Sequence, residues 1–133
     1  MRISRSAEYA LLAVGYIAQH QDEKVVLSQN ISKEYNIPLE YLLKILQQLV
    51  RVNVLHSKRG PHGGFSLARP PKKITMLQII EAVDGPVISQ LSMAEQTHGA
   101  RFSVRAEKIY EKAVAQTRAV LGKAKLSSLV EGR

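Results

Sequence analysis

The 133-residue chain has 45% hydrophobic and 23% charged residues, a balance that favours one folded domain over a disordered chain. Its formal net charge of +8 indicates a polyanionic partner, either nucleic acid or an anionic membrane surface. The absence of cysteine excludes disulfides, thiolate-held zinc or iron–sulfur centres and a cysteine nucleophile.

No apolar run approaches the roughly 18 residues of a membrane-spanning helix, and the N-terminus lacks the apolar core of a signal peptide. We therefore expect a cytoplasmic protein without a membrane partner. Paired carboxylates, a Ser/His/Asp pattern and a phosphate-binding loop are all missing, and the four histidines stand at isolated positions. We expect neither an enzyme nor a metal or other cofactor.

The first predicted helix runs from a cap at Ser4 or Ser6 to about His20. Its apolar residues recur at helical spacing, and they are Tyr9, Leu12, Ala13, Tyr16 and Ile17. Arg2 and Arg5 lie at its start, where the helix dipole favours acids. These charges are either ordinary surface residues or phosphate contacts, and we include Arg5 among the DNA-binding candidates.

Two further helices are predicted with only about three residues between them, which is helix–turn–helix spacing. Ser28 is the expected N-cap of the second helix, and Asn36 is a suitable left-handed residue at its end. The third helix begins near Pro38, because proline is tolerated in a first turn, and it continues to Val52.

The third helix has two distinct faces. The apolar face comprises Leu42, Ile45, Leu46, Leu49 and Val50, and the polar face comprises Glu40, Lys44, Gln47, Gln48 and Arg51. Amides and cations are groups that contact base edges and phosphates. Leu43 lies at the edge of the polar face, where it either packs under the following hairpin or meets a thymine methyl group.

A basic β-hairpin follows, with short alternating runs at 54–57 and 65–68 joined through a loop rich in glycine. Between Arg51 and Lys73 the chain has no acidic residue and six basic ones, namely Arg51, Lys58, Arg59, Arg69, Lys72 and Lys73. This hairpin has the character of a nucleic-acid-binding wing. Glycines at 60, 63 and 64 allow close backbone approach because they lack a Cβ.

After a stiff connector at 69–73, in which proline excludes helix, Thr75 and Gln78 predict a capping box for a fourth helix that ends at Gly85. We expect a mobile loop at 87–102, a long helix from Ser103 to about Leu121, and a short final turn at 126–129. The apolar stripe of the long helix needs a partner. It is available either for dimerisation or for packing back onto the first helix, and both remain open.

The chain resembles the IscR/NsrR/CymR-type family of bacterial winged-helix transcription regulators. The resemblance runs from Met1 to about Pro86 and rests on strings at 9–11, 37–42, 59–65 and 79–85. It implies a mainly α fold with a small β-hairpin wing, a winged helix-turn-helix domain at 1–86 and a dimerisation helix with a C-terminal tail at 103–133. It also implies a homodimer that binds a pseudo-palindromic double-stranded DNA operator, usually as a repressor.

Sensor relatives hold an iron–sulfur cluster through three cysteines in the segment that corresponds to 87–105, and here that segment has none. His98 and Met93 cannot replace three thiolates, so the chain resembles the cluster-free branch, whose signals are protein partners, small ligands or unknown. The alternative function is a winged-helix module whose basic face binds an acidic protein.

The expected roles are as follows. In the third helix, Glu40, Tyr41 and Lys44 face the major groove, while Ser28 and Gln29 present backbone amides to a phosphate. In the wing, Arg59 and His62 reach the minor groove. The DNA-binding candidates are Arg5, Ser28, Gln29, Pro38, Leu39, Glu40, Tyr41, Lys44, Lys58, Arg59 and His62. The dimerisation candidates are Ile109, Tyr110, Ala113, Val114, Thr117, Val120 and Leu121.

Overall fold

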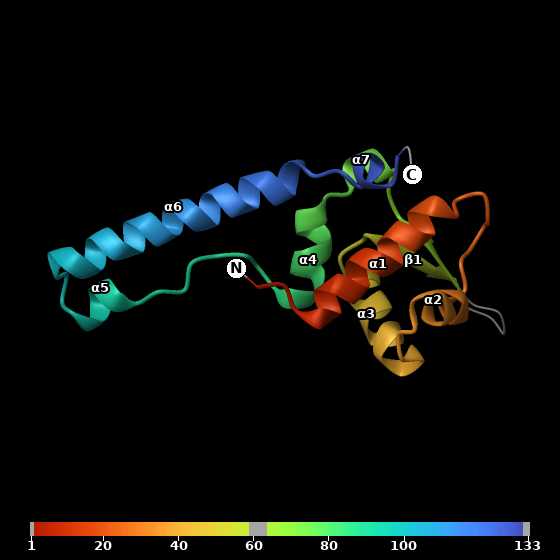
Figure 1. The fold of residues 1–133 in the computed structure, drawn as a ribbon, viewed down its shortest axis with the longest axis horizontal. Coiled ribbons are helices and arrows are strands. Elements are labelled where there is room, and N and C mark those ends of the chain that lie inside the picture. Colours follow the sequence, from red (N-terminus) through yellow and green to blue (C-terminus); the bar gives the residue numbers. More distant parts are fainter. Residues whose placement is uncertain (1, 59–63, 132–133) are drawn as a thin grey trace.

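The computed structural model describes residues 2–58 and 64–131, which form a head and a long arm (Figure 1). The head contains seven helical or strand elements from the first part of the chain, and the last helix returns to it. The elements are α1 (Arg5–Gln19), α2 (Ser28–Tyr35), α3 (Leu39–Arg51), β1 (Leu55–Lys58), β2 (Gly64–Leu67), the 3-10 turn η1 (Pro71–Lys73), α4 (Met76–Asp84), α5 (Met93–Gln96), α6 (Arg101–Lys123) and α7 (Leu126–Val130).

Helix α1 is the centre of the head, where it packs against α3, α4 and α7. It begins at Ser4, whose hydroxyl accepts a hydrogen bond from the backbone N–H of Ala7 at 3.0 Å. Its buried face is built largely of small residues, Ala7, Ala10 and Ala13 among them, and these allow neighbouring helices to approach closely. Leu12, one of the apolar residues at helical spacing, is 41% exposed because it lies on the side opposite that alanine face.

The two-faced character predicted for the third helix is confirmed in α3. Leu42, Ile45, Leu46 and Leu49 are buried in the core of the head, and Val50 at the edge is half-buried. Burying four branched aliphatic side chains contributes several kcal/mol, at about 1.5–3 kcal/mol each. The opposite face of the helix is therefore free for another role.

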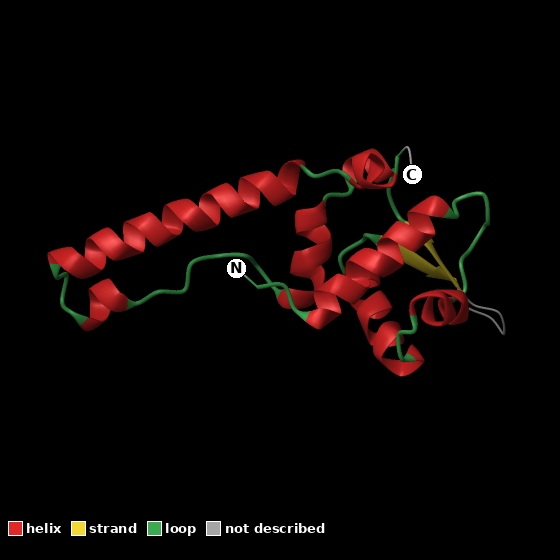
Figure 2. Ribbon diagram, in the orientation of Figure 1, coloured by secondary structure: helices red, strands yellow, loops and turns green. Residues whose placement is uncertain are grey.

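The wing is an antiparallel hairpin in which Leu55 pairs with Leu67 and Lys58 pairs with Gly64 (Figure 2). Val26, in the segment before α2, forms an additional antiparallel bridge with Phe65. Their two backbone hydrogen bonds are both 2.8 Å long and tie the wing to the rest of the head. A mainly helical head with one small hairpin is the fold class expected from the sequence.

The structure corrects three predictions of local structure. Pro71–Lys73 forms a 3-10 turn within the connector in which proline was expected to exclude helix. Proline is tolerated at the first helical position because the N–H that it lacks would have no partner within the helix there. The segment 87–102 is not a structureless loop but contains α5, whose Ala94 N–H donates to the carboxylate of Glu107 at 2.9 Å. Helix α6 begins at Arg101 rather than Ser103, which is buried and accepts a hydrogen bond from Thr97.

The arm consists of the linker 85–92, α5 and α6, and it projects from the head in Figure 1. Helix α6 packs against α4 near the head and against α5. The chain then returns to the head through a bridge between Thr75 and Lys125, and α7 packs on α1 with Leu126 buried. The short final turn predicted at 126–129 is therefore a helical turn that belongs to the core of the head.

Candidate nucleic-acid interface

The turn between α2 and α3 is fixed by hydrogen bonds around Ser32. Its carbonyl accepts from the backbone N–H of Ile37 at 3.0 Å, and its hydroxyl donates to the carbonyl of Ile37 at 2.5 Å. Asn36 adopts the left-handed conformation predicted for it, with φ of 55°, and Ile37 is buried. Pro38 then caps α3. These contacts fix the turn that joins α2 to α3.

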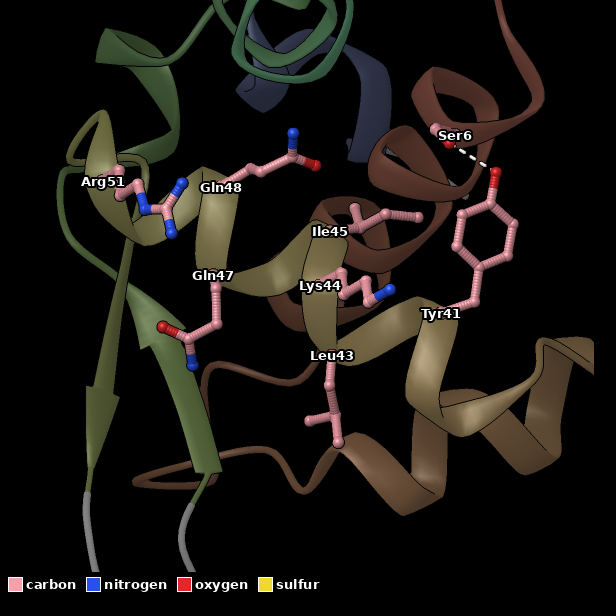
Figure 3. A pocket seen from close by; sticks show the side chains of 8 residues that line it. All are labelled: Ser6, Tyr41, Leu43, Lys44, Ile45, Gln47, Gln48 and Arg51. Carbon is pink, nitrogen blue, oxygen red and sulfur yellow. Dashed lines mark hydrogen bonds between the residues drawn. The ribbon is translucent and has the colours of Figure 1, made fainter.

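The exposed face of α3 forms a shallow hollow of about 530 Å³, drawn in Figure 3. The residues around it are Ser6, Tyr41, Leu43, Lys44, Ile45, Gln47, Gln48 and Arg51. We call this set the α3 surface. It contains two cations and two amides but no carboxylate, and this composition suits contact with phosphates and base edges.

Leu43 and Tyr41 lie at opposite edges of the α3 surface. Leu43 is half-buried and packs against the core, so packing accounts for part of its side chain. Tyr41 is 37% exposed, and its hydroxyl is hydrogen-bonded to the hydroxyl of Ser6 on α1. The Tyr41 ring also makes a T-shaped contact with the Tyr9 ring, with ring centroids 5.5 Å apart and planes at 79°. Tyr41 is therefore held by two residues of α1.

Arg5 lies next to this aromatic contact, with its guanidinium carbon 6.0 Å from the centroid of the Tyr9 ring. Tyr9, followed by the weaker effect of Glu8, raises the pKa of Arg5 above its usual value. Arg5 is also 3.9 Å from the carboxylate of Glu8, in a pair that is largely exposed. Arg5 therefore places a cation at the start of α1, beside the aromatic pair that Tyr9 forms with Tyr41.

Ser28 does not cap α2 as predicted. Leu27 is the N-cap, and Ser28 is the first helical residue and only 6% exposed, with its hydroxyl directed to the side-chain oxygen of Gln29 at 3.4 Å. As the first helical residue, Ser28 lies one position past the N-cap. Gln29 itself is exposed.

In the wing, Lys58 is exposed at the end of β1, whereas Arg59, Gly60, His62 and Gly63 lie outside the described residues. Gly64 is buried, and a Cβ there would lie 2.7 Å from the carbonyl oxygen of Val26. The close approach that we assigned to this glycine is therefore made to the head's own backbone.

Several predicted site residues lie together and others do not. Tyr41 and Lys44 share the α3 surface, and Arg5 is next to it, while Pro38, Leu39 and Glu40 lie at the start of the same helix. Ser28, Gln29 and Lys58 lie on other elements. Sequence reasoning missed Ser6, because its partner Tyr41 is 35 residues away and no local pattern connects them.

Among the described residues, no group of three or more histidine, aspartate or glutamate side chains is placed to hold a metal ion. Likewise, no helix in the described ranges is both long and apolar enough to cross a membrane.

A helix–turn–helix, an adjacent basic hairpin and a hollow on α3 lined by two cations and two amides define a winged-helix, DNA-binding transcription regulator. The chain belongs to the Rrf2 family, described as an iron-dependent transcriptional regulator, whose model matches residues 3–132. The family is one of regulators, not enzymes. The iron in that description does not fit a thiolate-held centre here, because the chain contains no cysteine, and one methionine (Met93) with one histidine (His98) cannot replace three thiolates.

Relatives support this assignment, one through a partial match at higher identity and one through a nearly full-length match at lower identity. An HTH-type transcriptional regulator of Aquifex aeolicus is 42% identical over 81 residues, which is 61% of this chain but 56% of that protein. The match thus spans little more than half of this relative. The IscR regulator of Cereibacter sphaeroides is 29% identical over 136 residues, covering 98% of this chain and 88% of that protein.

Solved structures show the same fold. The global cysteine regulator CymR of B. subtilis superposes with a TM-score of 0.80 at 22% identity, covering 100% of this chain and 98% of that one. IscR of T. potens gives a TM-score of 0.75 at 24% identity, with 98% and 87% covered. The likeness includes the arm as well as the head.

Proposed function

We propose that this chain is a sequence-specific regulator that binds a pseudo-palindromic operator as a homodimer, acts as a repressor and uses no iron–sulfur cluster. The observation that carries the proposal is the α3 surface, which combines Lys44 and Arg51 with two exposed or half-exposed amides and has no acidic residue. A helix with this face fits the major groove, which is wide enough to admit it.

Within the groove, the side chains divide by chemistry. Lys44 and Arg51 neutralise phosphates, while Gln47, Gln48 and Tyr41 offer hydrogen bonds to base edges. Arg5, Pro38, Leu39 and Glu40 lie around the same end of the surface and fix its register on the duplex. This division separates affinity, which depends on salt, from base preference, which does not.

Two other elements extend the contact. The N-terminal end of α2, at Ser28 and Gln29, faces a phosphate through its backbone amides. The wing brings Lys58, Arg59 and His62 to the adjacent minor groove, where a cation responds to groove width and negative potential. Replacing Arg59 by alanine should therefore weaken operator binding by roughly 1–3 kcal/mol, and unchanged affinity at fixed salt would contradict the wing assignment.

The proposed dimer interface is a strip along α6 that its own chain leaves uncovered. Phe102 and Ile109 are each 72% exposed and Val120 is 68% exposed, although all three are large and apolar. Phe102, the half-buried Ala106, Ile109 and Ala113 follow one another at steps of four, three and four residues, and Val120 lies seven residues further along. Such spacing is typical of a helix–helix seam, and the small alanines permit close approach.

The seven dimerisation candidates fall into two groups, exposed and half-buried residues of α6. Ile109, Ala113 and Val120 lie on the strip, Tyr110 is next to it, and Val114, Thr117 and Leu121 are half-buried by their own chain. We place the first group at the centre of the interface and the last group behind it. Two heads joined in this way present two α3 surfaces to half-sites about one helical turn apart, or a multiple of it.

The test is selection of bound sequences from a random duplex pool with the purified protein, followed by footprinting of the enriched motif. The expected result is a motif with two-fold symmetry. A motif without symmetry would remove the dimer but keep the α3 surface. Failure to enrich any sequence, together with salt-sensitive binding of an acidic protein, would replace DNA recognition by the protein-interaction alternative.

A further inference from the structure

The feature of interest is the contact between Ser6 on α1 and Tyr41 on α3. The two hydroxyl groups are hydrogen-bonded at the rim of the α3 surface, as Figure 3 shows. Tyr41 lies in the first turn of α3, and the N-terminal residues of a recognition helix are the ones that contact base edges. A tyrosine in this place therefore has a hydroxyl that is already partly engaged before DNA arrives.

The position of the Tyr41 ring is fixed at two points. Ser6 holds the phenol oxygen, and the edge-to-face contact with Tyr9 restricts rotation of the ring. Both contacts come from α1, one helical turn apart on the same face. Because α1 packs directly on α3, this restraint is part of the rigid head and not of a loop.

The chemistry of two bonded hydroxyls restricts what Tyr41 can offer to DNA. Each hydroxyl has one donor hydrogen and two acceptor lone pairs, and the mutual bond uses one donor and one acceptor. The hydrogen-bonding groups that the Tyr41 hydroxyl still offers to DNA depend on its bond to Ser6. The direction in which those groups point depends on the same bond. Without Ser6 the phenol hydrogen would rotate freely and could satisfy either an acceptor or a donor on a base.

Ser6 does not have the structural duty that Ser4 has. The hydroxyl of Ser4 accepts from the N–H of Ala7 and is also hydrogen-bonded to the carboxylate of Asp84, so it caps α1 and ties it to the end of α4. The hydroxyl of Ser6 is directed across to α3 instead. Loss of the Ser6 hydroxyl consequently removes a contact to Tyr41 and leaves the helix cap in place.

We propose that Ser6 is a specificity-determining positioning residue: it holds the Tyr41 phenol in the orientation that discriminates one base pair in each half-site. The inference rests on the proposed function, in which α3 lies in the major groove. It assigns to α1 a role in choosing the sequence, although α1 itself does not enter the groove. The base pair concerned is the one that faces the first turn of α3.

The experiment compares binding-site profiles of the full chain and of Ser6→Ala, Tyr41→Phe and the double variant, each selected from the same random duplex pool. Both single variants should lose preference at the same base pair, by roughly 5- to 10-fold. The double variant should lose no more than Tyr41→Phe alone, because the two changes break one linked contact. Ser6→Thr, which keeps the hydroxyl, should restore the preference.

Ser4→Ala is the matched structural control, and it should lower the thermal midpoint and weaken all sequences alike without changing the profile. A uniform loss of this kind for Ser6→Ala would overturn the inference, as would a change at a base pair that Tyr41→Phe does not affect. If the unmodified protein enriches a motif and Ser6→Ala leaves it unchanged, the inference fails while the proposed function stands. If the unmodified protein enriches nothing, both fail.

Discussion

Arg118 on α6 forms an ion pair with Glu81 on α4, and both side chains also hold the backbone of Val87. The N–H of Val87 donates to the Glu81 carboxylate at 2.7 Å, and its carbonyl accepts from the Arg118 guanidinium at 3.1 Å. Helix α4 of the head and the linker and α6 of the arm therefore meet at one cluster of charge-assisted hydrogen bonds. This cluster sets the direction in which the arm leaves the head.

Replacing Arg118 by alanine should destabilise the junction by about 1 kcal/mol. Hydrogen bonds to charged groups contribute more than neutral ones, but Arg118 is 40% exposed and solvent screens part of the effect. The free energy of unfolding from denaturant titration measures the loss. Arg105→Ala is the matched control, because Arg105 is an exposed arginine on the same helix, and its replacement should change stability little. Equal losses for the two variants would contradict the assigned role of the cluster.

Gly64→Ala should destabilise the head by ~1–3 kcal/mol, as overpacked positions do. The new Cβ would lie 2.7 Å from the carbonyl oxygen of Val26 and 3.0 Å from the Cβ of Val25. The backbone bridge between Val26 and Phe65 must open to admit it. Thermal unfolding measures the cost, and amide exchange at Phe65 and Val26 should accelerate.

Gly15→Ala is the matched control for Gly64→Ala. Gly15 lies inside α1, and a Cβ there would meet nothing within 4 Å. Alanine favours the helix over glycine, so this variant should gain up to about 1 kcal/mol. A gain for both variants would show that the wing tolerates a side chain at position 64.

If α6 forms the proposed dimer interface, Ile109→Glu should give monomers, measured by sedimentation at several protein concentrations. Ile109 is 72% exposed in the single chain, so the head and α6 should keep their helix content. A carboxylate buried against a second α6 would carry a large desolvation cost. Lys108→Gln changes the net charge by the same amount on the neighbouring position and should leave the dimer intact. Monomers with both variants, or dimers with both, would contradict the proposed seam.

Lys44→Ala should reduce the slope of log affinity against log salt concentration by about 1, as expected for one lost phosphate contact. The measurement is a titration of the selected operator at several salt concentrations. Lys112→Ala, at an exposed position on α6, should leave the slope unchanged. A Lys44 variant that keeps its salt slope but loses preference among bases would mean that Lys44 contacts a base edge directly.

The helices of the head could be predicted from the sequence because periodicity and capping chemistry coincide there. Thr75 and Gln78 form the predicted capping box, with both hydrogen bonds in place, and Asn36 adopts the left-handed conformation expected for it. In α3 the spacing of the aliphatic residues alone separates the buried face from the exposed one. These signals are local, and they extend over a few residues each.

What the sequence could not provide were contacts between distant segments. Ser28 is the first residue of α2 rather than its N-cap, and its burial depends on how α2 packs on the rest of the head. Helix α5 contains few apolar residues and is stabilised in part by Glu107 on α6. Its own residues therefore carry no hydrophobic periodicity from which a helix could be predicted. The pairing of Ser6 with Tyr41 depends on how α1 crosses α3, which side-chain periodicity does not specify.

The return of the chain to the head at Thr75 and Lys125 means that the core of the head includes a residue that follows the arm in the sequence. The N–H of Met76 donates to the carbonyl of Ala124, and the N–H of Leu126 donates to that of Ile74, both at 2.8 Å. The arm is therefore an insertion within the head, and the last core side chain, Leu126, leaves the ribosome after the whole arm has been made. A single protease cut in the linker would therefore leave two fragments. The fragment that carries the arm should stay bound to the head, because its α7 packs on α1 and its α6 packs on α4.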